Sequence, residues 1–198
     1  MIDRNTWVLA SHNPGKIKEL QALLGKHGVA LKGAAGLGLD EPEETESTFE
    51  GNAGLKAKEA WRATGLTCLS DDSGLSVDAL GGEPGIFSAR WAGEARDFGL
   101  AMARVHDALL ASGSDDHGAR FVCVVALCRP DGEIMHFRGE VAGQIVWPPR
   151  GEGGFGYDAI FQPDGHDRTF AEMSAAEKQS ISHRGRALAA LLAAEFGR

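Results

Sequence analysis

The sequence of 198 residues lacks a long hydrophobic run, a run of like charge and a cluster of basic residues. Without an apolar stretch of about 20 residues, we expect neither a membrane-spanning helix nor a signal peptide, and we predict a cytoplasmic protein. The formal net charge of -8 argues against binding to nucleic acid or to an anionic membrane. Any phosphate binding must therefore depend on a few well-placed cations.

Cysteine is also scarce in this sequence. The three cysteines, Cys68, Cys123 and Cys128, lie in apolar, strand-like runs, and their spacing matches neither a zinc ribbon nor a redox pair. Free cysteine is among the residue types that are most often buried. The pattern predicts three buried structural thiols.

The hydrophobic pattern alternates between strand-like and helix-like segments, without a repeat or a low-complexity linker. Apolar runs predict strands at residues 6–10, 29–31, 66–69, 75–79, 121–127 and 134–137. Helical spacing predicts helices after residue 15, after a capping box at residues 47–50, at residues 98–110, and at an apolar face of Leu188, Leu191, Leu192 and Phe196. We expect a mixed α/β (α+β) fold in a single domain over residues 1–198, with room for two lobes.

One candidate phosphate site is the segment from Ser11 to Lys16, which lies between the first strand and the first helix. A helix N-terminus offers free N–H groups and a favourable dipole to an anion, and Lys16 adds a positive charge. The spacing of a P-loop is absent. The alternative is an ordinary Asn-Pro-Gly turn beside a surface lysine.

A candidate metal site is the segment Asp71-Asp72-Ser73-Gly74, which we predict to be a turn at the end of a buried strand. Two adjacent carboxylates there need water or a cation nearby. Carboxylates suit Mg²⁺, which binds few protein ligands and is completed by water and substrate phosphates. The acidic loop around Glu43 and Glu44 offers a further ligand. The alternative for both segments is a solvated loop.

The glycine-rich segment before Tyr157 is a candidate site for a nucleobase. Glycines around Phe155 predict an exposed ring on which a base can stack, with Asp158 nearby. The alternative places Phe155 and Tyr157 in the core. Lys178, His183 and Arg184, just before the last predicted helix, are either ligand contacts or polar residues at a helix start.

These segments together closely resemble the inosine triphosphate pyrophosphatase family, whose members remove non-canonical purine nucleotides. The resemblance runs from about residue 7 to residue 192 and rests on motifs at residues 11–16, 70–75, 81–85, 88–90, 154–158 and 182–184. It implies an elongated mixed sheet flanked by helices, two lobes with a cleft between them, and a homodimer. It also implies Mg²⁺-dependent hydrolysis of ITP, dITP and XTP to the monophosphate and pyrophosphate.

The resemblance also assigns roles to individual residues. Asp72 corresponds to the catalytic base and Mg²⁺ ligand, and either Glu43 or Glu44 to a second metal ligand. Asp71 receives no role. The implied substrate contacts are Ser11, His12, Asn13, Pro14, Gly15, Lys16, Lys56, Ser73, Phe155, Gly156, Tyr157, Asp158, Lys178, His183 and Arg184. The sequence departs from the family pattern at Gly51, Trp91 and Ala159, where glutamate, tyrosine and proline are frequent.

Two other functions are compatible with these residues. A nucleotide-binding sensor would keep Lys16, Phe155 and Arg184 but would not need the carboxylates. A pyrophosphatase for other modified nucleotides is the second alternative. The carboxylates at residues 43, 44, 71 and 72 favour an enzyme, and the segments at residues 155–158 and 182–184 favour purine substrates.

Overall fold

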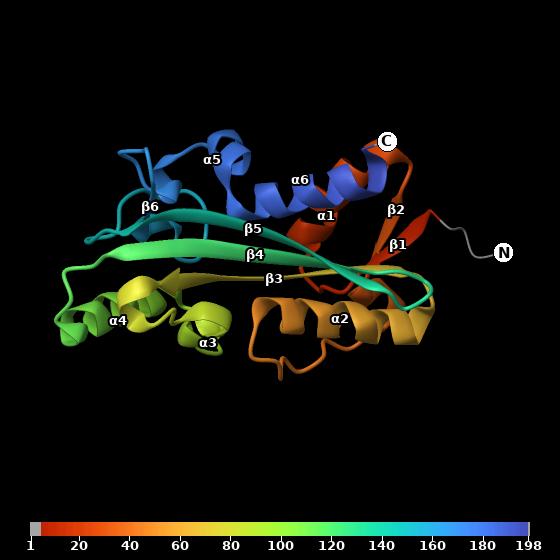
Figure 1. Ribbon diagram of the computed structural model, residues 1–198, viewed down its shortest axis with the longest axis horizontal. Helices are drawn as coiled ribbons and strands as arrows, with labels where there is room; N and C mark the ends of the chain where they lie inside the picture. The colour runs from red at the N-terminus through yellow and green to blue at the C-terminus, as the bar shows by residue number, and fades with distance from the viewer. Residues whose placement is uncertain (1–4, 198) are drawn as a thin grey trace. The chain divides into compact units, whose positions relative to one another are not determined.

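The computed structural model describes residues 5–197, which form a mixed sheet with helices packed against it (Figure 1). Within these residues there are six strands, in the order β2-β1-β3-β4-β5-β6, and six α-helices. Strand β1 is parallel to β2 and to β3, whereas β5 and β6 are antiparallel. The predicted mixed α/β fold is therefore confirmed.

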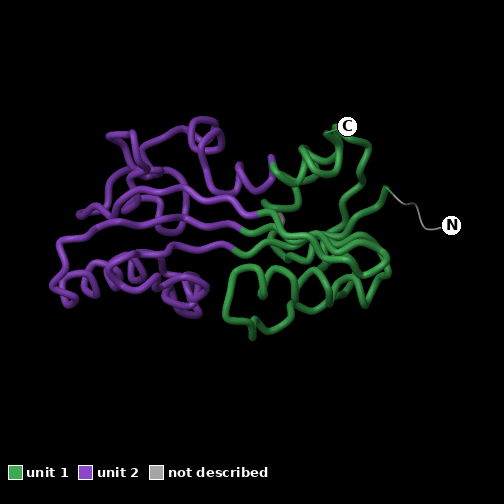
Figure 2. Tube along the Cα trace, viewed as in Figure 1, with its two compact units in different colours: residues 1–72, 124–137, 190–198 green, residues 73–123, 138–189 purple. Residues whose placement is uncertain are grey.

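The chain divides into two compact units (Figure 2). Unit 1 comprises residues 1–72, 124–137 and 190–198, and unit 2 comprises residues 73–123 and 138–189. Strands β3 (Thr67–Val77), β4 (Gly118–Cys128) and β5 (Ile134–Ile145) contribute residues to both units. The single domain, its two lobes and the cleft between them remain predictions.

Unit 1 is built on the short parallel strands β1 (Thr6–Leu9) and β2 (Ala30–Gly33). Val8 of β1 lies opposite Cys68 of β3, and both side chains are fully buried. Helices α1 (Pro14–Leu24) and α2 (Phe49–Thr64) cover opposite faces of these strands (Figure 1). A parallel pair needs a crossover connection, which α1 provides between β1 and β2.

The start of α2 differs from the prediction. The N-cap is Thr48, whose hydroxyl accepts a hydrogen bond from the Gly51 backbone N–H at 3.0 Å. A capping box needs Glu or Gln three residues after the cap, and Gly51 has no side chain to return the bond. The predicted capping box at residues 47–50 is therefore wrong, although α2 begins where the sequence indicated.

Unit 2 contains a core of aromatic and aliphatic side chains. Phe121 of β4 packs against Phe161 and Phe170, with ring centroids 4.6 Å and 5.8 Å away. Strand β6 (Phe161–Pro163) pairs with the end of β5. The helices that contribute to this unit are α3 (Ser88–Trp91), α4 (Phe98–Ser112), α5 (Ala175–Ile181) and the first half of α6 (His183–Phe196).

The segment from Asp71 to Gly74 is not a turn, which corrects the prediction. It lies in the middle of the 11-residue strand β3. Apolar residues that are buried lie on both sides of it, including Leu69 and Leu75, and they keep the strand within the sheet. The two carboxylates remain in the strand because each finds a cationic partner on a helix of unit 1.

Two predictions from composition can be compared with the structure. All three cysteines are buried and are not joined in disulfides, as predicted. Across residues 5–197, every helix is too short or too polar to cross a membrane.

Candidate active site

The loop before α1 satisfies its own backbone groups. The Asn13 side-chain oxygen accepts hydrogen bonds from the backbone N–H groups of Gly15 and Lys16, at 2.9 Å and 3.3 Å. The Asn13 N–H in turn donates to the Ser11 hydroxyl at 3.2 Å. The expectation of free N–H groups is therefore wrong for Gly15 and Lys16, because Asn13 serves as the N-cap.

His12 and Pro14 belong to the same loop but do not take part in these hydrogen bonds. His12 is exposed, and its Nε2 donates to the Leu39 carbonyl oxygen at 2.7 Å, which ties the loop to the start of the acidic segment. Pro14 is the first residue of α1, and its side chain lies outside the described part of the structure.

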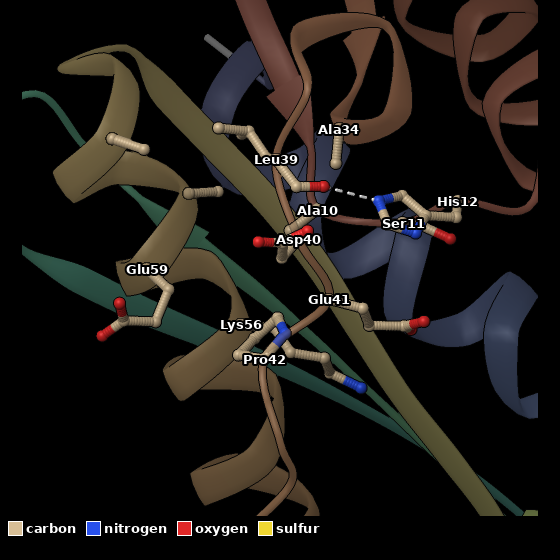
Figure 3. A pocket seen from close by; sticks show the side chains of 12 residues that line it. Ala10, Ser11, His12, Ala34, Leu39, Asp40, Glu41, Pro42, Lys56 and Glu59 are labelled. Atoms are coloured by element: carbon tan, nitrogen blue, oxygen red, sulfur yellow. Dashed lines mark hydrogen bonds between the residues drawn. The ribbon is translucent and has the colours of Figure 1, made fainter.

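A pocket of about 290 Å³ opens beside this loop within unit 1 (Figure 3). Ser11 and His12 line one side, and Lys56 of α2 lines another. Asp40 and Glu41 of the acidic loop also line it, together with apolar groups such as Leu39 and Pro42. The structure thus brings three of the predicted site residues to one concave surface.

Adjacent carboxylates on β3 point to opposite faces, because successive side chains of a strand alternate. Asp71 contacts Lys16 of α1: the ammonium nitrogen lies 2.6 Å and 2.8 Å from the two carboxylate oxygens. Asp72 instead faces α2, with one oxygen 3.4 Å from the Lys56 ammonium. One strand therefore anchors two lysines that belong to helices on opposite faces.

Asp72 is the most constrained carboxylate of this set. Its Oδ1 contacts Lys56, whereas its Oδ2 is buried and has no hydrogen-bond partner among the described residues. Burial raises the pKa of Asp72, the Lys56 ammonium opposes this shift, and the Glu44 carboxylate adds to it. The net result is a pKa above the ordinary value, which suits a group that must accept a proton.

Glu44, rather than Glu43, lies beside Asp72. The Lys56 ammonium donates to the Glu44 carboxylate at 2.8 Å, so it bridges Glu44 and Asp72. Glu43 is exposed. Burial lowers the pKa of Lys56, but attraction to Asp72 and Glu44 outweighs burial and leaves the pKa raised. Lys56 is therefore held as a cation.

The pair of Glu44 and Asp72 fits a magnesium ion that is completed by a ligand. Within residues 5–197, no group of three or more His, Cys, Asp or Glu side chains is arranged to hold a metal by itself. Mg²⁺ commonly takes one or two carboxylates and fills its other positions with water and phosphate oxygens. The buried, unpartnered Oδ2 of Asp72 is the observation that supports such a ligand.

Asn52 is a further candidate site residue, which the sequence pattern alone does not reveal. It is fully buried on α2, and its side-chain oxygen accepts a hydrogen bond from the Glu46 backbone at 3.1 Å. Its side chain also lies close enough to Asp72 to lower that carboxyl's pKa. The available signal was its position four residues before Lys56, which places both on one helix face.

Unit 2 carries the predicted base-binding segment, and its two aromatic residues have different environments. The Phe155 side chain is 64% exposed, as the glycine-rich sequence predicted. Tyr157 is buried in the core, where its hydroxyl donates to the Ser88 carbonyl oxygen at 2.8 Å. Burial raises the pKa of Tyr157. The core alternative is thus correct for Tyr157 and wrong for Phe155.

Asp158 holds the loop that presents Phe155. Its Oδ2 accepts hydrogen bonds from the Phe155 backbone N–H at 2.7 Å and from the Lys178 ammonium at 2.5 Å. Lys178 also lies 4.5 Å from the centroid of the Phe155 ring, within range of a cation–π interaction. Gly156 has φ 67°, a left-handed conformation that suits glycine.

His183 and Arg184 are the first two residues of α6, not residues that precede it. The buried His183 ring stacks on Phe121, with centroids 4.8 Å apart. The Arg184 guanidinium lies 5.8 Å from the centroid of the Phe155 ring. Unit 2 therefore brings Phe155, Lys178 and Arg184 together. Ser73, the remaining predicted substrate contact, is the first residue of unit 2 and directly follows Asp72.

Comparison with known proteins agrees with this fold. Residues 7–194 match the Ham1 family, and the chain belongs to that family. It is 53% identical over 200 residues to the dITP/XTP pyrophosphatase of Agrobacterium fabrum, with 94% of each chain covered. It is 54% identical over 190 residues to the dITP/XTP pyrophosphatase of Caulobacter vibrioides, with 96% of this chain and 97% of that one covered.

Solved structures show the same relationship. A HAM1 protein from Coxiella burnetii superposes with a TM-score of 0.93 at 40% identity, over 98% of this chain and 99% of that one. A nucleoside-triphosphatase, or dITP/XTP pyrophosphatase, from Mycobacterium abscessus gives a TM-score of 0.82 at 45% identity, over 94% and 98% of the two chains. The family resemblance seen in the sequence motifs is confirmed.

Proposed function

We propose that this chain is a Mg²⁺-dependent pyrophosphatase that hydrolyses dITP, XTP and ITP to the nucleoside monophosphate and pyrophosphate. Two of the relatives named above are dITP/XTP pyrophosphatases that are 53% and 54% identical to this chain over nearly its whole length. The observation that carries the proposal is the buried Asp72, which has one unpartnered oxygen and lies beside Lys56.

The reaction requires water to attack the α-phosphorus while the bond to the β-phosphate breaks and pyrophosphate leaves. We assign Asp72 to orient this water and take its proton, which its raised pKa favours. Lys16 and Lys56 stabilise negative charge on the phosphates, as placed cations do in phosphoryl transfer. Ser11 and Asn13 shape the loop that carries Lys16, while His12, Pro14, Gly15 and Ser73 remain predicted substrate contacts.

Asp72 and Glu44 are the residues that we expect to hold Mg²⁺. When bound, the ion would neutralise phosphate charge and polarise the reacting centre. We assign two tasks to Lys56. It holds the Glu44 and Asp72 carboxylates, which it contacts, and it binds phosphate in the pocket that it lines together with Ser11. Glu43 is exposed and is not proposed as a ligand.

On unit 2, we propose that the exposed Phe155 ring stacks on the purine base. We assign Arg184 and His183 to donate hydrogen bonds to the 6-oxo group that hypoxanthine and xanthine share. A site built around such a polar contact can reject adenine, which lacks the 6-oxo group, by orders of magnitude. Guanine shares the 6-oxo group, so we base its rejection on a pocket that leaves its 2-amino group without a hydrogen-bond partner. Lys178 and Asp158 fix Phe155, and Tyr157 supports the loop from the core.

The homodimer, the cytoplasmic location and the absence of nucleic-acid or membrane partners remain predictions. So does the behaviour of residues 1–198 as a single domain. The acidic net charge of -8 is consistent with a small-molecule substrate, whose phosphates are bound by local cations.

The decisive experiment is a panel of dITP, XTP, ITP, GTP and ATP with detection of pyrophosphate, in the presence and absence of Mg²⁺. We expect rapid release of pyrophosphate from dITP, XTP and ITP only when Mg²⁺ is present, and rates for ATP and GTP lower by at least about 100-fold. Tight binding of dITP without pyrophosphate release would indicate the sensor instead. Equal rates with all five substrates would contradict the proposed selectivity.

A further inference from the structure

We propose that Asp71 is a positioning residue, which fixes the Lys16 ammonium at the place where the nucleotide phosphates bind. This inference rests on the proposed function, since it gives a task to a residue that would act through a phosphate-binding lysine. It assigns Asp71 neither to the metal nor to proton transfer.

The contact between Asp71 and Lys16 has the geometry of a clamp. Both carboxylate oxygens lie within 2.8 Å of the same ammonium nitrogen. An ammonium carries three N–H donors, so a contact with two oxygens leaves a donor for a phosphate oxygen. The Asp71 side chain is 9% exposed and that of Lys16 is 27% exposed, so the carboxylate is the more buried partner.

This difference in burial explains why Asp71 can act as the fixed partner. It lies in the middle of β3, which stands between β1 and β4 in the sheet. Lys16 is in the first turn of α1 and has a flexible stem of four carbons. A buried carboxylate also needs a cation, so the pairing restricts Lys16 more strongly than an exposed ion pair would.

The second proposed phosphate-binding lysine is held in a parallel way. Lys56 contacts Asp72, the next residue of β3, from the opposite face of the sheet. The two ammonium groups are therefore anchored to consecutive residues of one strand. The backbone of β3 thus carries one partner of each lysine, and Glu44 holds the Lys56 ammonium further at 2.8 Å.

The test is a double-mutant cycle with Asp71→Asn, Lys16→Met and the combined variant. Asp71→Asn removes the charge but keeps the size of the side chain, and we expect kcat/KM for dITP to fall about 10-fold, mainly through KM. In the Lys16→Met background, the same change should alter kcat/KM less than about 2-fold, because its target is gone. Lys18→Met, on the same helix, is the matched control and should stay near the parent value.

Two results would overturn the inference. An equal loss from Asp71→Asn in both backgrounds would mean that Asp71 does not act through Lys16. An increase in the Mg²⁺ concentration needed for half-maximal rate, independent of Lys16, would make Asp71 a metal ligand. Asp71→Glu retains the charge and should recover part of the affinity, whereas a general packing defect would not be relieved by a longer side chain.

Folding and the proposed activity are checked separately. The combined variant removes both charges of the pair, so it should fold even if Asp71→Asn alone leaves Lys16 without a partner. If the parent protein hydrolyses none of the triphosphates, the proposed function fails. The same four proteins then test the clamp by calorimetric binding of inorganic triphosphate, where Asp71→Asn must weaken binding only when Lys16 is present.

Discussion

The two units hold their functional side chains by different means. In unit 1, the key groups form ion pairs in which each carboxylate on β3 has its own lysine, and Asp72 and Lys56 are almost fully buried. In unit 2, the central group is an apolar ring that is 64% exposed and is held through its backbone by Asp158. We therefore expect unit 1 to bind phosphate by charge at fixed positions and unit 2 to bind the base by stacking.

The largest expected effect comes from neutralising Asp72, which tests the role of charge in unit 1. We expect Asp72→Asn to lower kcat for dITP by about 1,000-fold, since loss of a general base typically costs between about 100-fold and 10,000-fold. The fold should persist, because asparagine has the same size and the buried charge is removed. Pyrophosphate release and the circular dichroism spectrum are the measurements.

Asp78→Asn serves as the control for this variant. Asp78 forms an exposed ion pair with Arg120 in unit 2, so its loss should leave the rate unchanged. Turnover of Asp72→Asn near the parent rate would remove Asp72 from the chemistry.

Removal of the exposed ring tests the contribution of unit 2. We expect Phe155→Ala to lower kcat/KM for dITP by about 10-fold or more, because stacking of a base on an aromatic side chain contributes roughly 1–3 kcal/mol. The melting temperature should hardly change, because the ring is mostly exposed. Steady-state kinetics and thermal unfolding measure the two effects.

Leu110→Ala is the matched control for Phe155→Ala. Leu110 is 68% exposed on α4 in the same unit, and its loss should change neither quantity. A fall in melting temperature without a change in kcat/KM would show that Phe155 supports the fold and does not contact the base.

The smallest expected effect concerns α5, the short helix that carries Lys178. Unlike α2, it begins with a true capping box, formed by Ser174 and Glu177. A hydrogen bond from Arg168 and bonds from Ser174 lower the pKa of Glu177 from 4.5 to about 2. Because the folded-state pKa is lowered, the stabilisation is present above pH 4.5 and is lost as the pH falls towards 2.

Glu177→Gln should therefore speed amide hydrogen exchange in α5 at pH 7 more than at the acidic end of this range. Exchange in α4, which is capped by Asp97 instead, should stay the same in the variant. Faster exchange throughout unit 2 would contradict a local role for the capping box.

Residue periodicity predicted most elements of this fold, because helices and strands have different hydrophobic repeats. The start of α1 and the helix at residues 98–112 could be predicted from local sequence alone. The prediction of a turn at Asp71 was wrong because the composition of this segment is typical of a turn. Only the lysines of α1 and α2, which are distant in sequence, explain why two carboxylates remain inside a strand.

Contacts between residues that are distant in sequence also limited the prediction of the candidate site. The sequence identified the loops and most of the charged residues, but not their pairings. The choice between Glu43 and Glu44 depends on which side chain reaches Lys56, and the loop has no periodicity from which to infer it. Asn52 was missed because a polar residue in a helix is usually exposed, and only its burial beside Asp72 distinguishes it.

The hydrogen bonds of Asn13 have a consequence for how unit 1 responds to its surroundings. Since its side chain already satisfies the N–H groups of Gly15 and Lys16, an anion at this loop gains little from the backbone. Its attraction comes mainly from side-chain charge, which mobile ions screen over about 8 Å at physiological ionic strength. We therefore expect phosphate affinity at this loop to fall with added salt, and the proposed stacking on Phe155 to depend on it much less.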